Sequence, residues 1–79
     1  MKLLFITPSG STDPVECDDI RLPVSDGGTC GIRPGHAEEL IALGEGNVTV
    51  FLAGREIFSR AVCSGIALVD RNGVRVISG

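Results

Sequence analysis

The residues of this chain that could do chemistry are Cys17, Cys30, Cys63, a single histidine, His36, and scattered carboxylates. A zinc site usually draws its ligands from close pairs such as C-x₂-C, because two ligands on one tight turn pre-organise half of the tetrahedron. The cysteines form no such pair, so a Cys₃His site would have to be assembled by folding alone. We therefore expect no metal site, and we expect the thiols to act as small buried hydrophobes.

A cysteine–histidine nucleophile is a second chemical hypothesis, with Cys30 and His36 as the pair. Nothing near them resembles an oxyanion site at a helix N-terminus, and a chain of 79 residues leaves little room for a substrate cleft. The sequence accordingly predicts no catalytic residue, no cofactor and no small-molecule substrate.

The glycine-rich run from Gly27 to Gly31 invites comparison with a phosphate-binding loop. It lacks the G-K-[ST] ending of such loops, and Ile32, Arg33 and Pro34 follow it where a helix would be needed. The glycines instead indicate a connection whose backbone needs positive φ angles. Two interpretations of segment 27–36 stay open at this point: a tight connection between strands, or a rigid surface on which another protein docks.

The composition excludes several partners. A net charge of −3 and a pI near 4.9 argue against nucleic acid, which rewards clustered Lys and Arg. No apolar run approaches the ~20 residues of a membrane-spanning helix, and no secretory signal is visible. Together with the odd number of cysteines, this predicts a reducing compartment and three unpaired thiols. The length fits one domain, residues 1–79.

Short β-type runs separated by Gly, Pro, Asn and Asp make up most of the chain, which is typical of a small antiparallel sandwich or barrel. The pair Asn72-Gly73 predicts a hairpin, and Ala53 to Glu56 forms the tip of another. Pro23 lacks a donor N–H, so its strand end is expected at a sheet edge. Segment 36–43 fits either a short helix or a short strand. The expected core consists of Leu4, Ile6, Ile20, Leu22, Val48, Val50, Leu52 and Leu68.

A resemblance covers nearly the whole chain. The run Gly28-Thr29-Cys30-Gly31-Ile32-Arg33-Pro34-Gly35-His36-Ala37, followed by Leu40, Leu43 and Gly46, resembles the pattern G-x-x-G-I-x-P-G-H-A…L…L…G of the epsilon subunit of F-type ATP synthases. Thr7-Pro8-Ser9-Gly10 is similar to the opening turn of that family. The late glycine and final strands also match, at Gly65, Val69, Val74 and Val76.

The resemblance implies an all-β fold, a sandwich of about ten short antiparallel strands. It implies a non-catalytic subunit of the central stalk, which contacts the gamma subunit and the ring of c subunits and couples rotation to ATP synthesis. The protein would then lie at the cytoplasmic face of the membrane, which it reaches only through the complex. Carried over by position, the docking segment consists of Gly28, Thr29, Gly31, Ile32, Arg33, Pro34, Gly35 and His36.

One departure from the pattern bears on the partner: Glu38 and Glu39 stand where the family usually has Pro-Leu. The alternative function, which these charges would favour, is a free-standing β-sandwich binding module of the same fold with a different partner. The family's C-terminal helical hairpin is not part of these 79 residues, so regulation by that hairpin is not attributed to them.

Overall fold

The frequent turn residues of this chain divide it into strands. The computed structural model describes residues 1–78, which form ten strands and no helix. The bounds are β1 Lys2–Thr7, β2 Gly10–Ser11, β3 Val15–Glu16, β4 Asp19–Pro23, β5 Thr29–Ile32, β6 Glu39–Leu43, β7 Gly46–Leu52, β8 Arg55–Val62, β9 Gly65–Asp70 and β10 Gly73–Ile77.

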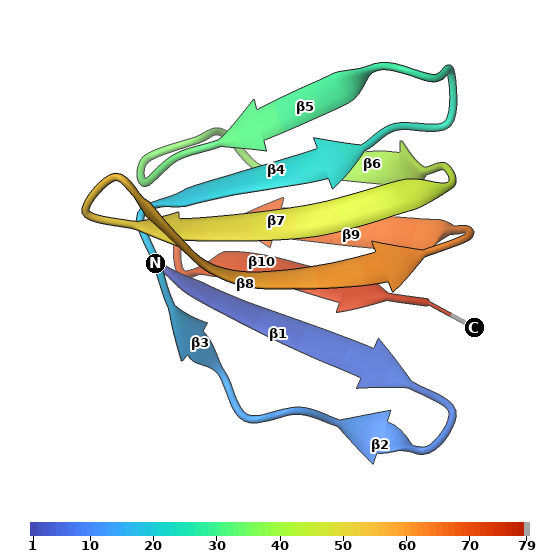
Figure 1. The fold of residues 1–79 in the computed structure, drawn as a ribbon, viewed down its shortest axis with the longest axis horizontal. Helices are drawn as coiled ribbons and strands as arrows, with labels where there is room; N and C mark the ends of the chain where they lie inside the picture. The colour runs from blue at the N-terminus through green and yellow to red at the C-terminus, as the bar shows by residue number, and fades with distance from the viewer. Residues whose placement is uncertain (79) are drawn as a thin grey trace.

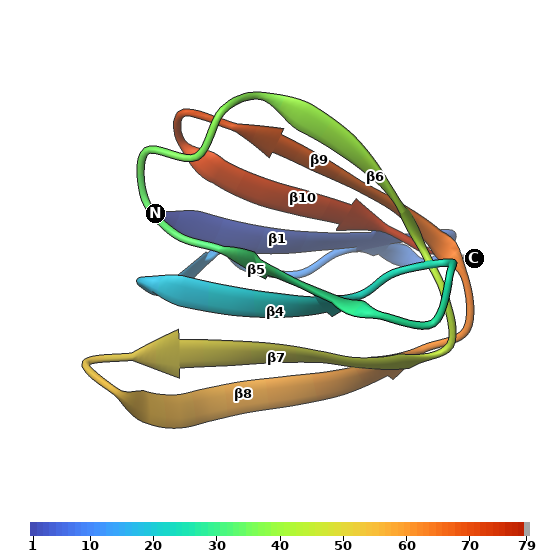
Figure 2. The same ribbon diagram turned by 90° about the horizontal axis from the view of Figure 1, so that it is seen from above.

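The strands form two sheets that pack face to face. The larger sheet has the order β2-β1-β10-β9-β6, with β3 also paired to β1, and the smaller sheet has the order β5-β4-β7-β8. Figure 2 shows the two layers, with β1, β10 and β9 in one and β4, β7 and β8 in the other. The predicted β-sandwich is confirmed. One strand pair departs from the antiparallel pattern: β1 and β10 run parallel. This pairing places the first and last strands of the domain side by side (Figure 1).

Segment 36–43, for which the sequence allowed a helix or a strand, contains β6. Ile41 and Leu43 point into the core, whereas Leu40 is 63% exposed, which is the period-2 pattern of a half-buried strand. A bridge between Val24 and Leu43 joins the end of β4 to β6 and closes one side of the sandwich. On the other side, the rings of Phe5 and Phe58 meet with centroids 5.6 Å apart.

The core lies between the two sheets and is entirely apolar. Ile20, Leu22, Val48 and Val50 are fully buried, as the sequence predicts. The remaining buried side chains are Leu3, Phe5, Cys17, Ile32, Ile41, Leu43, Val62, Ala67, Val69, Val74 and Val76.

The prediction was wrong for the faces of β1 and β9. Leu4, Ile6 and Leu68 are half-buried on the outer face of the larger sheet, while their neighbours Leu3 and Phe5 fill the core. Both strands are apolar at consecutive positions, so alternation in the sequence cannot tell which face points inward. The outer face of this sheet consequently carries aliphatic side chains on several neighbouring strands.

The prediction that Leu52 lies in the core was wrong, because Leu52 is the last residue of β7 and is only partly covered. The register between β7 and β8 shifts between Val50 and Phe51, so that Val50 pairs with Phe58 but Phe51 pairs with Glu56. The extra residue, Ile57, belongs to β8, so the bulge does not change the alternation of β7. Leu52 lies beside the turn at Ala53 and Gly54 and is 41% exposed, and the bulged residue Ile57 is 46% exposed.

Pro23 does not lie on an edge strand, contrary to the sequence prediction. Its strand, β4, runs between β5 and β7. The pairing of β4 with β7 ends at Arg21, two residues before Pro23. The Pro23 carbonyl accepts a 3.1 Å hydrogen bond from the Gly44 N–H, beyond that ladder. The pairing of β4 with β7 therefore requires no backbone N–H from Pro23. For this reason an interior strand tolerates a proline at this position.

Candidate docking surface

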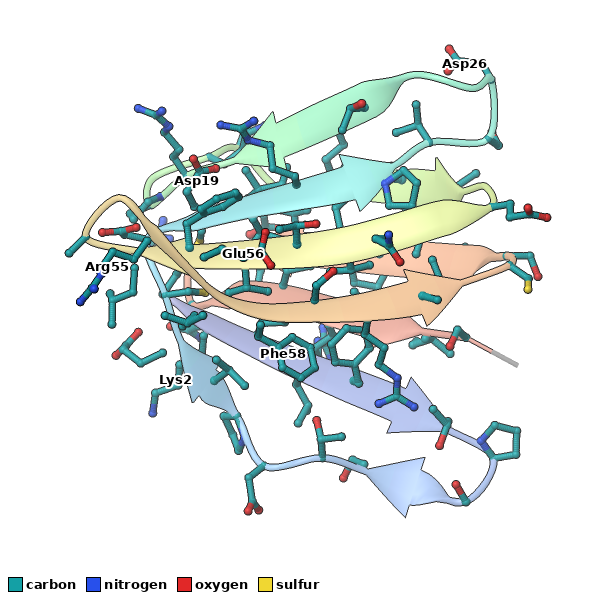
Figure 3. All side chains as sticks on the ribbon, viewed as in Figure 1. Lys2, Asp19, Asp26, Arg55, Glu56 and Phe58 are labelled. Carbon is teal, nitrogen blue, oxygen red and sulfur yellow. The ribbon has the colours of Figure 1, made fainter. Side chains whose placement is uncertain are left out.

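The docking segment predicted from the sequence is not one loop. Residues 29–32 form β5, an edge strand of the smaller sheet. Gly28 precedes this strand at one end of the sandwich, and residues 33–36 follow it at the other end. Figure 3 shows the two ends, marked by Asp26 in the β4–β5 turn and by Asp19 at the start of β4. The segment therefore extends along one edge of the molecule and offers two separate end regions.

A tight turn positions the residues at the His36 end. The His36 N–H donates a 3.1 Å hydrogen bond to the Arg33 carbonyl, which closes a four-residue turn with Pro34 and Gly35 at its centre. Gly35 has φ +85°, and proline followed by a glycine with positive φ is the arrangement of a type II turn. The backbone at Pro34 and Gly35 is thus held in one shape and exposed.

The His36 side chain is held by two neighbours. Its Nδ1 lies 2.8 Å from the Ala37 carbonyl oxygen, so Nδ1 carries the proton and donates. Its Nε2 lies 3.8 Å from Oε1 of Glu39, one of the two carboxylates that depart from the family pattern. The imidazole is 31% exposed, so part of the ring remains accessible to a partner.

The other end of the segment is a compact turn. The Asp26 carboxylate accepts a 3.0 Å hydrogen bond from the Gly28 N–H, and the Val24 N–H donates to the Gly28 carbonyl. Gly27 has φ +98°, as the glycine run predicts. Thr29 begins β5 and is exposed beside this turn.

Two positions of the segment contribute differently from the sequence prediction. The Ile32 side chain is fully buried, so only its backbone is available to a partner. A β-carbon added at Gly31 would meet nothing within 4 Å, and Gly31 has no positive φ. Gly31 is therefore a flat, open position on the outer face rather than a backbone requirement.

The structure adds three residues to this surface that sequence reasoning missed. Asp19 Oδ2 lies 3.5 Å from Nη2 of Arg21 and 3.8 Å from Nη2 of Arg33. The Arg21 guanidinium in turn lies over the Phe51 ring, 5.2 Å from its centroid. These contacts depend on the pairing of β4 with β5 and β7. No local pattern in the sequence predicts that pairing.

Comparison with known proteins decides the family. The sequence matches the family described as ATP synthase, Delta/Epsilon chain, beta-sandwich domain, over residues 1–79. The chain belongs to this family. A comparison with curated protein sequences finds no significant match.

Two solved structures share the fold of this delta/epsilon domain. The first is a chain of the Tetrahymena thermophila mitochondrial ATP synthase, from a structure of the central stalk and c-ring. Its identity is 14% and its TM-score 0.76, and the match covers 99% of this chain. The second is a chain of the Euglena gracilis mitochondrial ATP synthase, from a structure of OSCP, F1 and the c-ring. Its identity is 21% and its TM-score 0.78, over 96% of this chain. The delta/epsilon domain spans 62% and 48% of the lengths of these two chains.

The delta/epsilon chain is a non-catalytic part of ATP synthase, and the family therefore assigns this domain no catalytic chemistry. The potential metal ligands do not converge: within residues 1–78, no three Cys, His, Asp or Glu side chains are grouped to hold a metal ion. Nor does this part of the chain include a helix long and apolar enough to span a membrane.

The three cysteines of the delta/epsilon domain are unpaired, as predicted. The prediction that all act as buried hydrophobes was wrong, because only Cys17 is buried and Cys63 is exposed. Burial raises the pKa of the Cys17 and Cys30 thiols. A raised thiol pKa disfavours the thiolate, so neither thiol has the character of a catalytic nucleophile.

Proposed function

We propose that this domain docks onto the gamma subunit and the c-ring of an ATP synthase rotor and so couples rotation to ATP synthesis without chemistry of its own. The domain would lie at the cytoplasmic face of the membrane and reach it only through the complex. The docking residues are Gly28, Thr29, Gly31, Arg33, Pro34, Gly35 and His36, with Ile32 taking part through its backbone.

The observation that carries this proposal is the shape of the His36 end within a member of the delta/epsilon family. A type II turn holds Pro34 and Gly35, and a β-carbon at Gly35 would meet no atom within 4 Å other than those of Gly35 itself and its two chain neighbours. A surface that is already ordered before binding loses little conformational entropy when a partner covers it. Rigid docking of this kind is what transmission of torque between subunits requires.

The two ends of the segment allow two partners to bind at once. They are separated by the four residues of β5, or roughly 13 Å at the usual rise of an extended strand. The edge of β5 between them exposes unpaired backbone groups, which a partner strand or loop can use.

The decisive experiment measures each end against each partner. Thr29→Arg alters the Gly28 end and His36→Ala alters the other end, and each purified variant is titrated against isolated gamma subunit and against detergent-solubilised c-ring. If one end contacts a given partner, the variant altered at that end should lose about 1–3 kcal/mol of binding free energy for that partner, the range for central interface positions. Ser11→Arg, exposed on β2 of the other sheet, is the control and should bind as the unchanged domain does.

Thermal melts of the same variants separate docking from folding. His36→Ala should change stability by less than about 0.5 kcal/mol, because a partly exposed loop side chain supports little packing. Unchanged affinity for both partners, together with a large loss of stability, would assign the segment a structural role only and overturn the proposal.

The alternative, a binding module with a different partner, is favoured by one observation. Glu38 and Glu39 place two carboxylates beside the His36 end, where the family usually has Pro-Leu. If the unchanged domain binds neither gamma nor the c-ring, this alternative replaces the rotor function. A second outcome would keep the rotor function. If Glu38→Pro/Glu39→Leu raises the affinity for gamma, the two carboxylates fit the surface to a gamma subunit that differs from the one tested.

A further inference from the structure

Two guanidinium groups share one carboxylate at the His36 end of the sandwich. Arg21 points from the outer face of β4, and Arg33 follows β5 directly. Both approach the same oxygen, Oδ2 of Asp19, at 3.5 and 3.8 Å. These distances exceed those of charge-assisted hydrogen bonds, which are about 2.7–2.9 Å, so most of the guanidinium donors remain available.

The neighbouring residues hold Arg21 in place and leave it accessible. Phe51, which pairs with Asp19 across β4 and β7, lies beneath the guanidinium at 5.2 Å. A cation over an aromatic face is attracted to it, and this fixes the side chain without using its N–H donors. On the other side Arg21 pairs with Gly31, which has no side chain to cover it. Arg21 is 53% exposed.

Within residues 1–78, Asp19 is the only carboxylate that lies within 4 Å of either guanidinium group. Asp18 is turned toward the β7–β8 turn, where its Oδ2 accepts a 3.0 Å hydrogen bond from the Ala53 N–H. Glu39, at the same end of the sandwich, lies 3.8 Å from Nε2 of His36 rather than beside the arginines. One carboxylate therefore serves two arginines, and each guanidinium group keeps donors for a further carboxylate.

The arginines border a hollow that can receive a side chain. It has a volume of about 540 Å³ and is lined by Asp19, Arg21, Gly31, Arg33, Pro34, Gly35 and His36. Five of these seven residues belong to the docking segment, so the hollow lies within the proposed docking surface. The hollow is open, so a free anion would stay largely hydrated there, whereas an anionic group carried by a docked protein would be covered by its own chain.

We propose that Arg21 and Arg33 form a recognition site for a carboxylate of the docking partner, an Asp or Glu side chain that binds both guanidinium groups beside Asp19. The proposal rests on the docking function and names the chemistry of the partner at this end. Planar guanidinium forks match carboxylates in a bidentate manner, which a lysine cannot do. The incoming carboxylate would complete an alternating set of two positive and two negative charges.

Charge reversal with a matched control tests the site. Arg33→Glu and Arg21→Glu are compared with Arg75→Glu on the outer face of the other sheet. Arg75 is 52% exposed and lies 3.8 Å from Asp70, so its exposure and ion pairing resemble those of Arg21. All three variants change the net charge equally. Each is checked by a thermal melt before it is titrated against isolated gamma subunit and against detergent-solubilised c-ring.

We expect Arg21→Glu and Arg33→Glu each to weaken binding to one of these partners roughly tenfold or more at about 0.05 M salt, because a like charge then meets the partner's carboxylate. The loss should shrink as salt rises to about 0.5 M, since ions screen the repulsion. Arg75→Glu should bind within about threefold of the unchanged domain. If Arg21→Glu and Arg33→Glu bind like Arg75→Glu while the unchanged domain still binds, the inference is wrong and the docking function stands. If the unchanged domain binds neither partner, the docking function and this inference fall together.

Cross-linking identifies the carboxylate directly. Arg33→Lys keeps the charge and supplies an amine that a carbodiimide joins to a neighbouring carboxylate. The variant should bind more weakly than the unchanged domain but more tightly than Arg33→Glu, and it should cross-link to an Asp or Glu of the partner. A cross-link to Asp19 alone would show that the two arginines serve only the internal ion pair and would overturn the proposal.

Discussion

The amino nitrogen of Met1 lies 3.1 Å from Oε2 of Glu16 and donates a 3.0 Å hydrogen bond to the Cys17 carbonyl oxygen. The hydrogen bond that this ammonium group donates to the Glu16 carboxylate, together with its positive charge, lowers the pKa of the Glu16 carboxyl below its ordinary value of 4.5. Glu16 itself is 64% exposed, so the interaction is open to screening by salt.

The Met1–Glu16 contact makes stability depend on pH. A carboxyl whose pKa is lower in the folded state contributes stability above its unfolded pKa and loses that contribution as pH falls through its folded pKa. Urea unfolding should therefore find Glu16→Gln less stable than the unchanged domain near pH 7, with a difference that disappears toward about pH 2. Acetylation of Met1 should return the pKa of Glu16, followed by NMR, toward 4.5. A difference in stability that persists at full protonation would contradict this account.

Val50 and Leu52 should differ sharply in their contribution to stability, because Val50 is fully buried whereas Leu52, at the end of β7, is partly exposed. Val50→Ala leaves a cavity between the sheets and should cost about 1–4 kcal/mol of unfolding free energy. Leu52→Ala removes a side chain that is 41% exposed and should cost less than about 1 kcal/mol. Chemical denaturation of the two variants measures both values. Equal losses would mean that Leu52 is packed in the core as Val50 is.

Gly73 should tolerate no β-carbon. At φ +145°, a β-carbon there would overlap the Lys2 carbonyl oxygen, in the parallel pair of β1 and β10. Gly73→Ala should therefore lower stability by about 3 kcal/mol or more, or prevent folding. Gly31→Ala is the control, because its β-carbon would meet open space, and its melt should match the unchanged domain within about 0.5 kcal/mol. If the thermal melt of Gly73→Ala also matches that of the unchanged domain, the prediction is wrong.

The three thiols should react at different rates. Cys63 is exposed, whereas burial raises the pKa of Cys30 and of Cys17, whose Sγ also lies 3.7 Å from the Met1 carbonyl oxygen. Since the thiolate is the reactive form, alkylation of the native domain should modify Cys63 first and Cys17 last. In denaturant without reductant, thiol counting should find all three free. A count of one would reveal a disulfide.

The turns and several core positions could be predicted from local chemistry. Asn72-Gly73 indicated the hairpin that joins β9 to β10, and the glycine run indicated the positive φ of Gly27, although Gly28 and Gly31 in the same run have none. The buried faces of β4 and β7 up to Val50 were also predictable, because Ile20, Leu22 and Val48 alternate with polar residues. These features depend on neighbours along the chain.

The orientation of β1 and the position of Pro23 could not be predicted in the same way. Consecutive apolar residues in β1 fit either face, and the choice of Leu3 and Phe5 follows from the parallel pairing with β10, which is far away in the sequence. Pro23 is tolerated inside a sheet only because the ladder with β7 has already ended at Arg21. Strand order decides both outcomes.

The sequence by itself determined a β-rich domain and the family motif around Pro34, Gly35 and His36, because turn residues and alternation act locally. Only the tertiary structure decided that the motif sits at one end of an edge strand and that Arg21 and Arg33 meet at Asp19. The reason is that strand pairing brings together side chains from β4, β5 and β7, and their register depends on the packing of the whole core rather than on spacing along the chain.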